Sequence, residues 1–197
     1  MIPVKQGEYM GHTDYIEKIK QLLDSVEITR GGNLLSYDDG IESLLQIMYA
    51  TRQAHRQLFF AGNGGSAAIA EHMTADYLKN GHMRTVSLYD SPVLTCLGND
   101  YGYEHVFSKQ LDMMGERGDV LVAISSSGNS QNIINAIEVM RSLRGNVVTF
   151  TGFDKENKVR KLGDVNVYVP SSEYGKVESI HNLLLQQVVD KLYEEGI

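Results

Sequence analysis

Apolar residues recur at helical spacing in the first quarter of the chain. In residues 15–26 and 39–55, isoleucine, leucine and methionine return every three or four positions, which predicts two amphipathic helices. Residues 29–33 (TRGGN) separate these helices and predict a loop. Because no strand pattern precedes residue 57, we expect both helices to pack outside the sheet or against another subunit.

From residue 57 onward, short continuous apolar segments alternate with amphipathic ones. The apolar segments predict five strands, at residues 57–61, 84–88, 119–124, 146–150 and 165–169. Helices are predicted between and after them, at residues 67–78, 103–114, 131–143, 158–162 and 176–194. Apolar strands that alternate with helices are typical of a parallel sheet covered on both faces. The expected fold is therefore α/β, a three-layer sandwich whose five-stranded parallel sheet is flanked by helices, with an N-terminal helical extension.

Composition and charge narrow the class of protein. The chain has 197 residues, of which 42% are hydrophobic and 22% charged, as in an ordinary globular domain. A net charge of -7 argues against nucleic acid as a partner, because phosphates need a basic surface. The single cysteine, Cys96, excludes internal disulfides and is expected in the core, as are Met113 and Met114. The chain has no apolar run of roughly 20 residues and a polar start, so we expect a cytoplasmic protein without a membrane partner.

A glycine-rich turn follows the first predicted strand, at residues 62–68 (GNGGSAA). Glycine lets the backbone turn tightly and approach a ligand, and Ser66 is expected to cap the next helix, whose first N–H groups favour an anion. The pattern Gly62-x-Gly64-x-x-Ala67 also fits a dinucleotide fingerprint, with Asp90 near the end of the next strand, farther along than the roughly 20 residues that fingerprint has. A plain strand-to-helix turn is the structural alternative.

A serine-rich turn follows the third predicted strand, at residues 125–130 (SSSGNS). Its hydroxyl groups lie beside a helix N-terminus, which makes a phosphate cradle that needs no basic residue. The turn lacks the lysine of a Walker loop, so nucleoside triphosphate hydrolysis is not expected. Such turns are often structural only. Two anion-friendly turns in one small α/β domain fit a phosphorylated sugar, with the phosphate at one turn and sugar hydroxyls at the other.

The motifs resemble those of the SIS (sugar isomerase) domain family. They are GNGGSAA at 62–68, LGNDYG at 97–102, GDVLVAISSSGNS at 118–130 and TG at 151–152. Within that family the chain is most similar to the phosphoheptose isomerases, which interconvert sedoheptulose 7-phosphate and D-glycero-D-manno-heptose 7-phosphate. The resemblance implies a doubly wound, flavodoxin-like phosphosugar-binding domain over residues 57–197. It also implies a homotetramer with sites at subunit interfaces, in which the helices of residues 1–56 serve oligomerisation.

The resemblance further implies which residues bind the sugar phosphate. They lie on three loops of the sequence: Asn63, Gly64, Gly65, Ser66, Asn99, Asp100, Ser125, Ser126, Ser127 and Ser130.

The catalytic and metal positions match the family less closely. His72 stands where the family has its metal histidine, Asp76 where it has glutamate, Glu178 where it has glutamine and Gln186 where it has histidine. His72 and Asp76 are four residues apart and so share a helix face. By resemblance, one Zn²⁺ per subunit is expected on His72, Asp76, Glu178 and Gln186, with Asp76 and Glu178 also touching the substrate.

These replacements change the expected chemistry. Aldose–ketose isomerisation moves a proton between adjacent carbons and needs a base. The side chain of Gln186 does not titrate, so Asp76 or Glu178 is the expected base. Aspartate is one methylene shorter than glutamate, and a displacement of 1 Å can cost about 10²-fold in rate. His181, three residues after Glu178, is expected to be structural or to lie at an interface.

Three functions are therefore weighed. The favoured one is an isomerase of sugar phosphates with altered catalytic positions. The second is a non-catalytic SIS protein that senses a phosphosugar or binds a protein partner, because the family's histidine and arginine are replaced at Gln186 and Asn80. The third is a dinucleotide-binding protein, although the serine-rich turn has no role in it.

Overall fold

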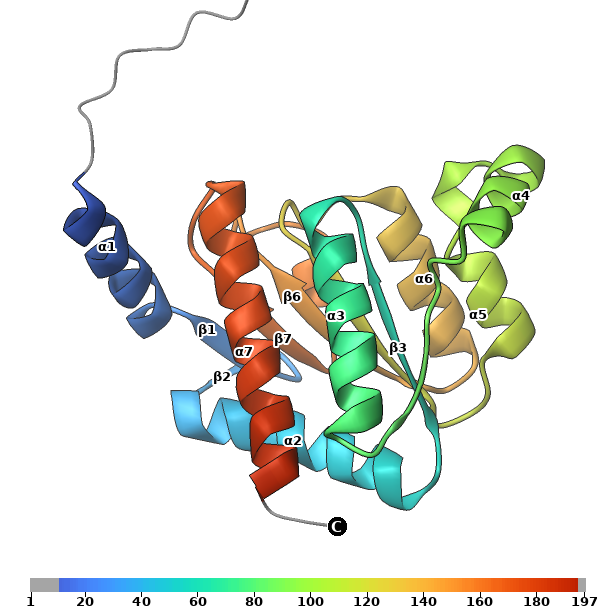
Figure 1. The fold of residues 1–197 in the computed structure, drawn as a ribbon, viewed down its shortest axis with the longest axis horizontal. Coiled ribbons are helices and arrows are strands. Elements are labelled where there is room, and N and C mark those ends of the chain that lie inside the picture. Colours follow the sequence, from blue (N-terminus) through green and yellow to red (C-terminus); the bar gives the residue numbers. More distant parts are fainter. Residues whose placement is uncertain (1–10, 195–197) are drawn as a thin grey trace, which may run out of the picture.

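A seven-stranded sheet runs through the centre of the protein, with helices on both faces (Figure 1). The computed structural model describes residues 11–194. The strand order is β2-β1-β7-β6-β5-β3-β4. None of the helices in residues 11–194 is both long and apolar enough to cross a membrane.

The parallel part of the sheet confirms the five predicted strands. It contains β3 (Gln57–Gly62), β4 (Arg84–Val86), β5 (Val120–Ser125), β6 (Asn146–Thr151) and β7 (Val165–Tyr168). Each of these strands pairs in parallel with its neighbour. All residues of β5 and β7 are buried, as expected for strands covered on both faces.

An antiparallel hairpin extends the sheet beyond the predicted five strands. It is formed by β1 (Glu27–Arg30) and β2 (Asn33–Leu35), and β1 pairs antiparallel with β7. The prediction of a loop over residues 29–33 is wrong at both ends, because only Gly31 and Gly32 form the turn. Their φ angles of 56° and 83° suit a two-residue hairpin turn, in which the primed turn types need positive φ. The sheet is therefore mixed and seven-stranded rather than parallel and five-stranded.

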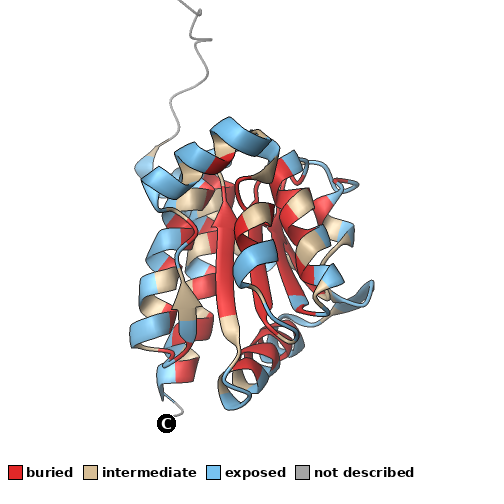
Figure 2. Cartoon of the chain, turned by 90° about the vertical axis from the view of Figure 1, so that its right-hand side faces the viewer, coloured by how far each residue is buried: buried red, intermediate tan, exposed pale blue. Residues whose placement is uncertain are grey.

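Two helical layers enclose the sheet, and the strand side chains alternate between them. One layer consists of α2 (Tyr37–Gln53), α3 (Gly65–Lys79) and α7 (Tyr174–Glu194). The other contains α5 (Ser108–Met114) and α6 (Gln131–Ser142). Figure 2 shows the buried strands between helices whose outer surfaces are exposed. The three-layer α/β arrangement is as predicted.

The first predicted helix and the second have different surroundings. In α1 (His12–Asp24) no residue is buried, and Ile16 is 53% exposed. Figure 1 shows α1 at the edge of the molecule, beside β1. In contrast, α2 packs on the sheet through Leu44 and Met48, each 1% exposed. The division of the chain at residue 57 stays a prediction.

The segment between β4 and β5 departs most from the predicted elements. An unpredicted helix, α4 (Ser91–Tyr101), begins where Asp90 accepts a hydrogen bond from the backbone of Val93. Gly102, with φ 89°, ends it, and the predicted helix over 103–114 divides into a 3-10 turn, η1 (Tyr103–His105), and α5. The predicted helix over 158–162 is a single 3-10 turn, η2 (Val159–Lys161).

Three apolar residues predicted for the core lie at the surface of this part of the fold. Cys96 is exposed, and Met113 and Met114 are 67% and 39% exposed. The prediction is wrong because α4 buries Leu97 alone and α5 buries Ser108, Gln110 and Leu111, which leaves the other side chains of these short helices at the surface.

Candidate functional site

The two turns singled out in the sequence lie side by side at one edge of the sheet. Strands β3 and β5 are parallel neighbours, and Gly62 is in register with Ile124. The glycine loop (residues 62–66) and the serine loop (residues 125–130) therefore leave the same edge. After β3 the chain continues into α3 on one face, and after β5 it continues into α6 on the other. The two loops thus flank the crevice at which doubly wound sheets bind their ligands.

A small cavity of about 120 Å³ opens between these loops. Its lining residues are mostly polar: Asn63, Ser66, Ile124, Ser125, Ser126, Ser127, Ser130, Tyr174 and Glu178. The hydroxyl oxygens of Ser125 and Ser126 are buried and have no hydrogen-bond partner within residues 11–194. A buried polar group left unpaired costs about 1–3 kcal/mol. These two hydroxyls are therefore set to bind an oxygen-rich ligand.

Backbone conformation brings the glycine loop close to the cavity. Gly64 has φ 56° and no side-chain cap, and it occupies the N-cap position of α3. The expectation that Ser66 caps this helix is wrong, because Ser66 lies inside the first turn with its side chain buried against the cavity. Gly62 is held by Tyr89, whose hydroxyl accepts from the Gly62 N–H and donates to its carbonyl, each at 2.7 Å. The loop is therefore fixed before any ligand binds.

The serine loop is held from behind by the crossover that follows β6. The Gly152 N–H donates to the Ser126 carbonyl at 3.0 Å, and the Val159 N–H donates to the Gly128 carbonyl at 2.9 Å. Gly128 has φ 64°, and a Cβ there would collide with the buried side chain of Asn157. These contacts fix the loop that supplies Ser125, Ser126 and Ser127 to the cavity lining.

The N-terminus of α6 adds a favourable potential for an anion. Ser130 is the N-cap residue of α6, yet its hydroxyl makes no capping bond, and the first turn carries no acidic side chain. The partial positive charge of the helix end is therefore uncompensated there. This arrangement suits a phosphate without a lysine or arginine among the lining residues.

Glu178 contributes the acidic side chain of the cavity lining. Its carboxylate lies directly against Gly65, where a Cβ would overlap both carboxylate oxygens. Burial raises the pKa of the Glu178 carboxyl above its ordinary value. A carboxyl with a raised pKa in a polar cavity is a candidate for acid–base work.

His72 and Asp76 lie on adjacent turns of α3, away from the cavity lining. The His72 Nε2 atom is 3.6 Å from an Asp76 carboxylate oxygen. Seven residues separate Gly65 from His72, a rise of about 10 Å along the helix. Within residues 11–194 no three histidine, cysteine, aspartate or glutamate side chains come together as metal ligands.

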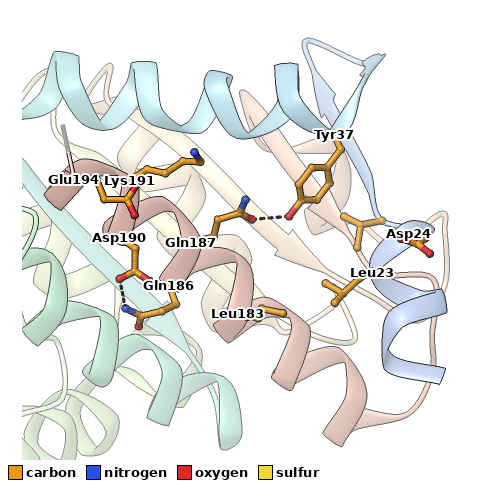
Figure 3. Close-up of a pocket in the computed structure, with 10 residues that line it drawn as sticks. Leu23, Asp24, Tyr37, Leu183, Gln186, Gln187, Asp190, Lys191 and Glu194 are labelled. Carbon is orange, nitrogen blue, oxygen red and sulfur yellow. Dashed lines mark hydrogen bonds between the residues drawn. The ribbon is translucent and has the colours of Figure 1, made fainter. Parts of the chain in front are cut away.

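Gln186 faces a different hollow from the one lined by the serine loop. It lines a groove of about 830 Å³ between α7, α2 and the end of α1. Figure 3 shows Gln186 there beside Gln187, which accepts a hydrogen bond from Tyr37. The Gln186 amide donates to Asp190 at 2.8 Å. The four residues expected to hold Zn²⁺ are therefore not gathered into one ligand set within residues 11–194.

The remaining predicted residues lie on α4, outside the cavity lining. The Asn99 amide donates to the Asp100 carboxylate at 2.9 Å, and Asp100 also accepts from the Cys96 thiol. Asp90 is engaged as the N-cap of this helix, so the dinucleotide alternative loses its acidic group.

Sequence reasoning missed two polar residues that contact the cavity lining, Asn132 and Tyr103, and one lining residue, Tyr174. Asn132 was within reach, because it is the second residue of the helix that the serine loop opens. The positions of Tyr103 and Tyr174 depend on how separate elements pack, which no local pattern encodes.

The fold and the site together define a class: a doubly wound α/β domain with a serine-lined cavity at its switch point. The model of the SIS domain family matches residues 14–152. The phosphoheptose isomerase of Aliarcobacter butzleri is 31% identical over 192 residues, which are 93% of this chain and 94% of that protein. That of Akkermansia muciniphila is 36% identical over 170 residues, which are 83% of this chain and 89% of that protein.

Solved structures of phosphoheptose isomerases are also similar to this chain. The phosphoheptose isomerase from Neisseria gonorrhoeae superposes with a TM-score of 0.79 at 32% identity, covering 92% of this chain and 95% of that one. The chain belongs to the SIS domain family and, within it, to the phosphoheptose isomerases.

Proposed function

We propose that this protein is an aldose–ketose isomerase that converts sedoheptulose 7-phosphate into D-glycero-D-manno-heptose 7-phosphate. The observation that carries the proposal is the 120 Å³ cavity, whose lining combines a glutamate with two buried serine hydroxyls that have no partner in residues 11–194. The substrate is inferred from the relatives, which are named phosphoheptose isomerase.

The phosphate end of the substrate occupies the serine loop. Ser125, Ser126 and Ser130 donate hydroxyl hydrogens to phosphate oxygens, and the N-terminus of α6 stabilises the negative charge. Cavities for whole small molecules measure about 300–1,000 Å³. A volume of 120 Å³ is therefore too small for the whole substrate, so the carbon chain extends out of the cavity past Glu178.

Glu178 is the proposed acid–base group. In the ketose-to-aldose direction the base removes a proton from C1, an enediol forms, and a proton is returned to C2 while the hydroxyl proton passes from O1 to O2. Because its pKa is raised, the Glu178 carboxyl accepts and releases a proton nearer to neutral pH than an ordinary glutamate. Asp76 is the second candidate.

The assembly, the metal and the location complete the proposal. A homotetramer with sites between subunits is supported by α1, which has no buried residue, and by the small size of the cavity. A Zn²⁺ site on His72, Asp76, Glu178 and Gln186 stays a prediction, to be tested by metal analysis of the purified protein and by activity before and after chelation. A cytoplasmic location is proposed on the sequence alone.

The test is incubation of purified protein with sedoheptulose 7-phosphate, followed by detection of the aldose phosphate. Product formation that Glu178→Gln abolishes supports the proposal, since glutamine keeps the shape but cannot titrate. Stabilisation of the protein against heat by the sugar phosphate without any product would favour the alternative of a non-catalytic phosphosugar sensor.

A further inference from the structure

The side chain of Asn63 is held by two residues that do not line the cavity. Asn63 and Asn132 form a reciprocal amide pair in which each Nδ2 donates to the other's Oδ1 at 2.9 Å. The Tyr103 hydroxyl donates to the same Asn63 oxygen at 2.8 Å. Three elements therefore meet at one amide: the glycine loop, the start of α6 and η1.

These hydrogen bonds use most of the donor and acceptor capacity of the Asn63 amide. An amide oxygen has two lone pairs, and both are used, one by Asn132 and one by Tyr103. The amide nitrogen carries two hydrogens, and one is used on Asn132. The group that remains on Asn63 is a single N–H. Since Asn63 lines the cavity, it faces a ligand as a hydrogen-bond donor only.

We propose that Asn132 and Tyr103 are positioning residues that fix the Asn63 amide as a donor toward the sugar phosphate. The inference rests on the proposed function and adds two residues to it. A free asparagine side chain could turn its oxygen toward the phosphate, which would repel it. Turning the Asn63 amide over by itself would set oxygen against oxygen and nitrogen against nitrogen across the amide pair, so the pair opposes that rotation.

Asn132 and Tyr103 differ in burial and in their neighbouring contacts. Asn132 is 3% exposed, so its amide bonds are shielded from water. Tyr103 is 64% exposed and is kept in place by its own turn, whose Glu104 carbonyl accepts a hydrogen bond from Asn135 of α6 at 2.8 Å. We therefore expect a larger effect from removing Asn132 than from removing the Tyr103 hydroxyl.

The experiment compares Asn132→Leu and Tyr103→Phe with the unmodified protein. Two quantities are measured: KM and kcat with sedoheptulose 7-phosphate, and the apparent Kd from the thermal stabilisation that this sugar phosphate causes. Tyr103→Phe is expected to raise KM and Kd about 2- to 10-fold, the factor for one lost hydrogen bond, and Asn132→Leu more. Tyr193→Phe, another exposed tyrosine far along α7, is the matched control and is expected to change neither.

A double-mutant cycle separates positioning from a general effect on folding. If both residues act through Asn63, then adding Asn132→Leu or Tyr103→Phe to Asn63→Ala raises Kd no further. Full additivity, or an unchanged Kd in both single variants, overturns the inference while leaving the proposed function intact.

Measurements on the unmodified protein distinguish a failure of the positioning role from a failure of the proposed function. Binding without turnover removes the isomerase proposal, yet the Kd values still test the positioning residues. The absence of any stabilisation by the sugar phosphate overturns both.

Discussion

Substituting alanine for Gly65 separates the function of the site from the stability of the fold. Gly65 is the first residue of α3, and the Cβ of an alanine there would meet the two carboxylate oxygens and the Cδ of Glu178. The obstacle is the far end of a flexible side chain, so the backbone keeps its position. Glu178 instead has to rotate away from Gly65, which displaces its carboxylate.

Gly65→Ala is expected to change stability and activity in opposite directions. Alanine is more favourable than glycine in a helix by about 0.5–1 kcal/mol, so Gly65→Ala is expected to leave the free energy of unfolding unchanged or to raise it. A displacement of a catalytic group by about 1 Å can cost about 10²-fold in rate, which corresponds to roughly 2.7 kcal/mol in activation free energy. Denaturant unfolding and kcat/KM with sedoheptulose 7-phosphate measure the two quantities.

Gly175→Ala is the matched control. Gly175 also lies in the first turn of a helix, α7, and a Cβ there meets nothing within 4 Å. It is expected to give the same small gain in stability with unchanged kcat/KM. Full activity of Gly65→Ala would refute the role given to Glu178. A large loss of stability would show that the new Cβ meets more than the flexible end of Glu178.

Three further predictions concern the same region. Ser126→Ala removes a buried hydroxyl that has no partner in the described part of the chain, so the protein is expected to unfold at a higher denaturant concentration. Its affinity for sugar phosphate should fall about 10- to 100-fold, as for a lost hydrogen bond to a charged group. Burial raises the pKa of Glu178, so activity should fall as pH decreases through that raised pKa, and Glu178→Gln should become more stable than the parent as pH rises, because only the parent has to ionise a buried carboxyl. His181 is fully buried with a pKa lowered to about 4, so the folded protein resists its protonation, and stability should decline as pH falls from about 6.5 toward 4, by up to about 3 kcal/mol. His181→Leu should flatten that part of the profile, and an unchanged profile would show that other groups cause it.

The serine loop could be predicted from sequence because its signal is local. A buried strand, four serines, a glycine and the start of a helix lie within a dozen residues, and the parallel sheet places them at a ligand-binding edge. The register of Gly62 with Ile124 then brings the glycine loop beside it. These two local elements supply most of the cavity lining, to which α7 adds Tyr174 and Glu178.

The hairpin of β1 and β2 shows where local reasoning failed. Its turn, Gly31-Gly32, is a recognised hairpin signal, but the flanking strands are only four and three residues long. Strands so short have no measurable alternation of their own. What stabilises β1 is its pairing with β7, a strand more than 130 residues later, so the decisive interaction is absent from any sequence window.

Helix geometry explains why the predicted catalytic set does not share one cavity. Glu178 and Gln186 are eight residues apart on α7, which corresponds to a rise of about 12 Å and a rotation of about 80°. Side chains so displaced cannot both line a cavity of 120 Å³. His72 and Asp76, one turn apart, do meet, but two turns beyond the residue that contacts Glu178. Of the residues predicted to act on the substrate as acid or base, the fold therefore places Glu178 against the serine loop.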